Sequence, residues 1–144
     1  MSKNNITVFD IDEYYKPKVS FPDFDPMNKY LMLVPINDEA AERMYCYQIY
    51  DDGISDEFIC LEFNENTYKE MEPYFFFKLN DKFDIWISMD EEEVIWTENL
   101  DEAIKFTQTL LDTIDNQCAL EFGKIMLSMM KKAKELNTVI GFYF

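Results

Sequence analysis

The chain has 144 residues, the size of a single domain, and its 29 acidic against 13 basic residues give a net charge of −16. Apolar residues make up 48% and aromatic residues 17%, which excludes a disordered acidic tail because such segments lack the side chains for a core. No apolar run reaches the roughly 18 residues of a membrane span. Residues 1–5 lack the apolar stretch of a signal peptide, so we expect a cytoplasmic protein.

The acidity is regional. Residues 1–102 hold 25 acids and 8 bases, whereas residues 103–144 hold 4 acids and 5 bases. The first region therefore carries a charge of −17 and the second +1. We expect a folded body with one strongly acidic part.

The N-terminal part predicts an arm followed by a strand. Residues 10–28 contain Pro17, Pro22 and Pro26 and are typical of an extended arm, because proline removes a backbone donor. The run YLMLVPI at 30–36 predicts a buried strand, and residues 37–43 predict a helical turn after an Asn or Asp cap.

A hairpin is expected next, with strands at 43–50 and 56–63 around Gly53. Period-2 alternation places one apolar face toward the core, and it comprises Tyr45, Tyr47, Ile49, Ile59, Leu61 and Phe63. Cys46 and Cys60 then lie opposite each other on the other face. With Cys118 they make an odd number in no metal-like spacing, so we expect free thiols, with a Cys46–Cys60 disulfide as the alternative.

A short helical turn at 64–72, ended by Pro73, precedes a second predicted hairpin with strands at 74–79 and 83–89. A third strand is expected at 94–97. In this register Phe75, Phe77 and Leu79 face the core. Phe76 and Trp86 lie on the opposite face, where exposed aromatic residues among charges favour an interface, unless an N-terminal arm or helix covers them.

The C-terminal part predicts helices over 100–136 and a strand at 138–144. Asn99 and Glu102 have the spacing of a capping box, and residues 115–117 leave open whether there is one helix or two. The fold class is therefore α+β in a single domain (1–144). We expect an antiparallel meander of about five to seven strands over 30–97, covered by one or two C-terminal helices.

Several kinds of chemistry are excluded. The chain has no histidine, which removes the commonest general base and metal ligand. Arg43 is the one arginine, and three glycines spaced far apart cannot form a phosphate-binding loop. Acidic runs such as Asp10–Glu13 and Asp90–Glu93 do not fit a calcium loop, and we interpret them as solvated turns. We therefore expect a protein that is not an enzyme and holds no cofactor or metal.

A folded, aromatic-bearing acidic surface suits a basic protein partner, whereas direct nucleic-acid binding needs a basic patch. In size, acidity and mixed α/β pattern the chain resembles immunity proteins of contact-dependent growth-inhibition and related polymorphic toxin systems. That resemblance implies a cognate nuclease toxin as the partner. The alternatives are a phage-type DNA mimic, which is an anti-restriction or anti-CRISPR inhibitor, and an adaptor subunit that is acidic only for solubility. The predicted contact residues are Asp51, Asp52, Asp56, Glu57, Asp84, Trp86, Asp90, Glu91, Glu92 and Glu93.

Overall fold

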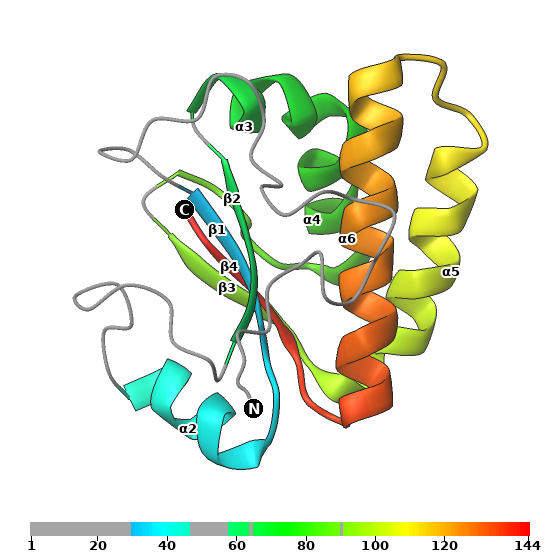
Figure 1. Ribbon diagram of the computed structural model, residues 1–144. Coiled ribbons are helices and arrows are strands. Elements are labelled where there is room, and N and C mark those ends of the chain that lie inside the picture. Colours follow the sequence, from blue (N-terminus) through cyan, green and yellow to red (C-terminus); the bar gives the residue numbers. More distant parts are fainter. Residues whose placement is uncertain (1–29, 47–57, 64, 90) are drawn as a thin grey trace, which may run out of the picture.

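The computed structural model describes residues 30–46, 58–63, 65–89 and 91–144 (Figure 1). Within them a four-stranded antiparallel open sheet has the strand order β2-β1-β4-β3. Its strands are β1 (Tyr30–Pro35), β2 (Phe58–Phe63), β3 (Glu92–Ile95) and β4 (Ile140–Tyr143). The α+β class is confirmed, and these strands are fewer than the five to seven expected. The predicted arm at 10–28 lies outside the described residues.

The two central strands come from distant parts of the chain. β1 is buried along its whole length and pairs with β2 from Tyr30↔Phe63 to Pro35↔Phe58. On its other side it pairs with β4, for example Met32↔Phe142. The strands predicted at 30–36 and 138–144 are thus confirmed, and the C-terminal strand lies inside the sheet.

The sheet has two differently covered faces (Figure 1). The larger core lies between one face and the helices α3 (Glu65–Met71), α4 (Phe77–Phe83), α5 (Leu100–Leu111) and α6 (Gln117–Leu136). On the other face Leu31, Leu33, Phe58 and Tyr143 form a smaller cluster with residues of α2 (Asp38–Cys46). Alternation along each strand supplies both clusters, as expected of a sheet with two buried faces.

Helix α2 occupies the first four residues of the strand predicted at 43–50. Asn37 caps it, because its Oδ1 accepts a hydrogen bond from Ala40 N at 2.8 Å. Ala40 and Met44, one turn apart, are buried against the sheet. The prediction of a helical turn at 37–43 is confirmed, and the strand prediction is wrong for residues 43–46. The rest of that strand and the turn at Gly53 lie outside the described residues.

β2 confirms the second strand of that hairpin, although it pairs with β1. Ile59, Leu61 and Phe63 face the larger core, as predicted. The placement of Cys46 opposite Cys60 is wrong because Cys46 belongs to α2. Cys60 and Cys118 form no disulfide with each other.

The second predicted hairpin is wrong. Residues 65–83 are helical, with a π-helical segment (Glu72–Phe76) joining α3 to α4, and residues 85–88 are not a strand. The buried positions follow helical spacing, and they are Thr67, Tyr68, Met71, Phe75, Phe76 and Leu79. Pro73 lies in the first turn of the π-helical segment, where its missing N–H is tolerated.

The C-terminal helical region consists of two helices. Asn116 begins α6, with its Oδ1 accepting a hydrogen bond from Ala119 N at 2.9 Å. The predicted capping box is wrong because the Asn99 side chain makes no capping hydrogen bond. Instead a 3₁₀ turn (Thr97–Asn99) leads into α5. β3 therefore overlaps the strand predicted at 94–97, beginning earlier and ending at Ile95.

Candidate partner-binding surface

The structure describes half of the predicted contact residues. Asp84 and Trp86 follow the end of α4, Glu91 precedes the edge strand β3, and Glu92 and Glu93 are the first two residues of β3. The other five lie outside the described residues, and they are Asp51, Asp52, Asp56, Glu57 and Asp90.

Backbone geometry and one carboxylate place Trp86. Asp84 ends α4 in the left-handed conformation, with φ 57°, which short polar side chains tolerate. The backbone N–H of Trp86 then donates to Glu93 Oε2 at 2.8 Å, while Glu93 Oε1 accepts from Val94 N at 3.0 Å. Glu93 thus ties the loop to the edge strand and brings Trp86 close to the acidic start of β3.

A pocket of about 280 Å³ lies beside this tryptophan, and we call it the Trp86 pocket. It is lined by Glu72, Phe77, Asn80, Asp81, Trp86, Ile87 and Ser88. Trp86 is 64% exposed and Phe77 52% exposed, and the charged residues of the described lining, Glu72 and Asp81, are both acidic. Trp86 is exposed, which is one of the two alternatives that the sequence left open, whereas Phe76 is fully buried in the core.

The walls of the Trp86 pocket are held by side-chain hydrogen bonds. The Asn80 amide donates to Ile87 O at 3.0 Å and accepts from Ile87 N at 2.6 Å. Buried Tyr68 donates its hydroxyl to Glu72 Oε2 at 2.5 Å. Burial raises the pKa of Tyr68 above its ordinary value, and the hydrogen bond to Glu72 raises it further.

The raised pKa of Tyr68 predicts that its contribution to the free energy of unfolding depends on pH. A raised folded-state pKa means that the stabilisation is fully present below the unfolded-state pKa of about 10 and is lost as pH rises above it. Tyr68→Phe is expected to lower the free energy of unfolding by about 1 kcal/mol at pH 7. Urea unfolding at pH 7 and above pH 10 should show this difference shrinking. A constant difference would contradict it.

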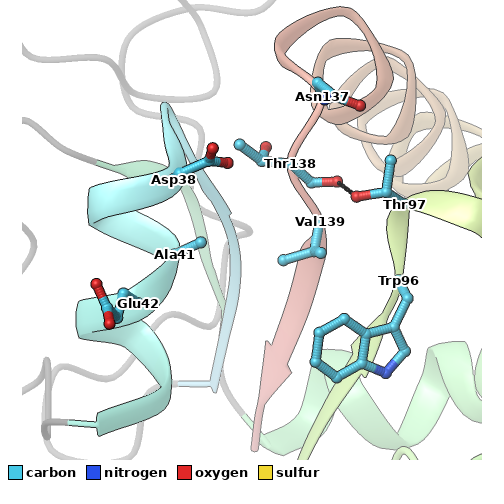
Figure 2. A pocket seen from close by; sticks show the side chains of 8 residues that line it. All are labelled: Asp38, Ala41, Glu42, Trp96, Thr97, Asn137, Thr138 and Val139. Carbon is cyan, nitrogen blue, oxygen red and sulfur yellow. Dashed lines mark hydrogen bonds between the residues drawn. The ribbon is translucent and has the colours of Figure 1, made fainter.

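A second pocket, which sequence reasoning missed, lies on the opposite face of the sheet (Figure 2). We call it the α2 pocket. Its volume is about 400 Å³, and it is lined by Asp38, Ala41, Glu42, Trp96, Thr97, Asn137, Thr138 and Val139. Trp96 is 48% exposed. In β3, Val94 packs on the α2 side, and the same period 2 is the sequence signal for Trp96 on that side.

Among the described residues no group of three or more acidic or cysteine side chains is placed to hold a metal ion. No helix in that part of the chain is long and apolar enough to cross a membrane. The chain matches no protein-family model, no curated protein and no solved structure at a significant level.

Proposed function

We propose that the chain is a binding protein that captures a basic protein partner through the Trp86 pocket and the acids around it. One observation carries the proposal: two largely exposed aromatic side chains flank a pocket whose described lining has two charged residues, both of them acidic. Exposure of the apolar tryptophan ring to water is unfavourable in the free protein, so its burial by a partner is favourable. Aromatic side chains are enriched among residues that dominate binding energy.

The surrounding charges favour a cationic partner. Asp84, Glu91 and Glu92 are exposed near the pocket, and the chain as a whole carries −16. Such a field accelerates encounter with a positively charged surface, while the aromatic contact slows dissociation. The acids at the edge strand also discourage pairing with another sheet, so an acidic edge alone would be equally compatible with an adaptor.

A nuclease toxin is the partner class that we place first, with the chain as its immunity protein. A nuclease carries a cationic groove for its substrate, and an acidic protein with an aromatic anchor fits that groove or its rim. The near-neutral charge of residues 103–144 weighs against a DNA mimic, which needs carboxylates over more of its surface.

The surface is tested by charge-neutral variants of three exposed acids. The triple variant Asp81→Asn, Asp84→Asn and Glu91→Gln is expected to weaken partner affinity about tenfold at low salt, mainly through the association rate. Trp86→Ala is expected to weaken it by about 30-fold, mainly through dissociation. Calorimetry and stopped-flow mixing at two salt concentrations measure both effects.

A matched control removes the same charge elsewhere. Asp112→Asn, Asp115→Asn and Glu121→Gln change three exposed acids near the α5–α6 connection, none of which lines either pocket. Equal weakening by both triples would mean that net charge alone drives binding and would refute the proposed surface. Affinity purification assigns the partner: a basic toxin domain whose nuclease activity falls on binding supports immunity. A restriction or CRISPR effector would establish the mimic, and assembly proteins alone would establish the adaptor.

A further inference from the structure

One wall of the Trp86 pocket is a helical segment that carries an acid, an aromatic ring and a second acid in turn. In the π-helical segment the backbone N–H of Phe77 donates to Glu72 O, five residues earlier. This hydrogen bond places Glu72 one turn before Phe77, and Asp81 follows Phe77 at i+4 in α4. All three line the pocket. The wall therefore presents an aromatic ring with a carboxylate one turn away on each side along the helix.

The second wall is the segment after α4, and it is held in place before any ligand arrives. The Asn80 amide bonds both the N–H and the carbonyl of Ile87, and the backbone N–H of Trp86 bonds Glu93 of β3. The backbone that carries Trp86 is thus fixed to α4 and to the sheet. A wall held in this way loses little conformational entropy on binding.

The acids of this pocket lack a cationic partner among the described residues. Within that part of the chain no lysine pairs with Glu72 or Asp81, and Lys82, which follows Asp81, pairs with Glu102 at 3.1 Å. Glu72 is half-buried, so its charge is less screened than that of a fully exposed acid. Its Oε2 accepts the Tyr68 hydroxyl, and no donor among the described residues bonds its Oε1.

We propose that the Trp86 pocket takes up one lysine side chain of the partner, with its ammonium on Glu72 and its aliphatic stem against the exposed rings of Phe77 and Trp86. The inference rests on the proposed function only for the source of that lysine, a basic protein. An ammonium is a compact charge that one oxygen can bind, and its four-carbon stem is stabilised by apolar contact.

The hydrogen bonding of Glu72 favours lysine over arginine. A guanidinium pairs best with both oxygens of a carboxylate, and the Tyr68 hydroxyl already occupies one oxygen of Glu72. The exposed Asp81 attracts the ammonium through its charge without having to contact it. The site is therefore expected to require a charge and a stem together.

A small probe tests the site without any partner. Because the chain has two tryptophans, Trp96→Phe leaves Trp86 as the single indole for fluorescence and NMR. Nα-acetyl-lysine methylamide is expected to shift the Trp86 indole and the Ser88 amide saturably, with a dissociation constant of about 1–50 mM. At equal ionic strength the norleucine analogue, which has the stem without the ammonium, is expected to bind about fivefold more weakly. The arginine analogue is expected to bind about threefold more weakly, and ammonium chloride is expected to cause no saturable shift.

One pair of variants identifies the carboxylate. Glu72→Gln keeps an oxygen that can accept the Tyr68 hydroxyl, so it removes the charge and retains the wall. In the Trp96→Phe background it is expected to weaken the lysine probe about fivefold. Glu70→Gln removes the same charge from an exposed position of α3 that does not line the pocket, and it is expected to leave the affinity unchanged.

The outcomes separate this inference from the proposed function. Saturable binding that needs the ammonium, the stem and Glu72 supports the lysine site, whether or not a partner is known. Absence of saturation, equal binding of the norleucine or arginine analogue, or equal affinity of the Glu72→Gln and Glu70→Gln proteins would overturn it. In that event a loss of partner affinity in Trp86→Ala would still uphold the proposed surface. Unchanged partner affinity in Trp86→Ala would refute that surface and leave the probe result standing.

Discussion

Phe76→Ala is expected to lower the free energy of unfolding by about 3–5 kcal/mol, whereas the neighbouring Phe77→Ala is expected to change it by less than about 0.5 kcal/mol. Phe76 is fully buried. The centroid of its ring lies 5.1 Å from the ring centroid of Phe144, 5.7 Å from that of Tyr68 and 5.9 Å from that of Phe122. Its removal leaves a cavity among rings that cannot close it. Phe77 points outward and loses little on truncation.

This pair of variants separates a helix from a strand. In a strand, Phe75 and Phe77 would share the buried face and Phe76 would be exposed, so the ranking of the two variants would be reversed. Urea unfolding followed by circular dichroism measures both free energies. If Phe76→Ala does not fold, Phe76→Leu provides a milder variant, expected to cost about 1–2 kcal/mol. A larger loss in Phe77→Ala than in either Phe76 variant would refute the helical assignment.

The parts of the fold that can be predicted are those in which the pattern of apolar residues fits one type of secondary structure over its whole length. Residues 100–136 carry helical spacing through many turns, and the runs at 30–36 and 138–144 are too short and apolar for an independent helix. Whether 100–136 held one helix or two depended on one local interaction, the Asn116 cap. The Asn116 side chain can accept the hydrogen bond that caps α6 only if the backbone of residue 116 is not part of the preceding helix.

The region 65–83 was mispredicted because its aromatic residues satisfy two periods. Phe75, Phe76 and Phe77 occur in a row, so any alternation that begins on one of them resembles a strand. Pro73 also suggested a helix end. In the structure the π-helical segment accommodates this proline and lets Phe75 and Phe76 both enter the core. Tertiary packing, which no local pattern encodes, decides between the two periods.

The two pockets differ in how far the sequence reveals them. The sequence places Trp86 among acids within one short segment and leaves open whether an N-terminal arm or a helix covers it. The α2 pocket is assembled from residues 38–42, 96–97 and 137–139. These segments meet because β4 inserts between β1 and β3. That strand order is a long-range property, and without it Trp96 has no recognisable neighbours.

Gly123→Ala is expected to lower the free energy of unfolding by up to about 2 kcal/mol, against the usual trend for a helix interior. Alanine gains about 1 kcal/mol over glycine in a helix. Here the added Cβ would lie 2.5 Å from Leu111 Cδ2 and 2.5 Å from Phe75 Cζ. Overpacking of this kind costs about 1–3 kcal/mol, and the Phe75 ring is held by stacking on Phe122, with centroids 6.0 Å apart. The overpacking cost is therefore expected to exceed the helical gain.

A second substitution tests whether the Phe75 ring causes this loss. Phe75→Leu removes the ring atom nearest to the added Cβ, so Gly123→Ala should cost less in the Phe75→Leu background than in the wild-type chain. A coupling of about 1 kcal/mol is expected in the double-mutant cycle, measured by thermal and urea unfolding of all four proteins. An additive cycle would assign the loss to Leu111 instead. A Gly123→Ala protein more stable than the wild type would show that α5 and α6 separate at low cost, contrary to the close approach of the two helices at this glycine.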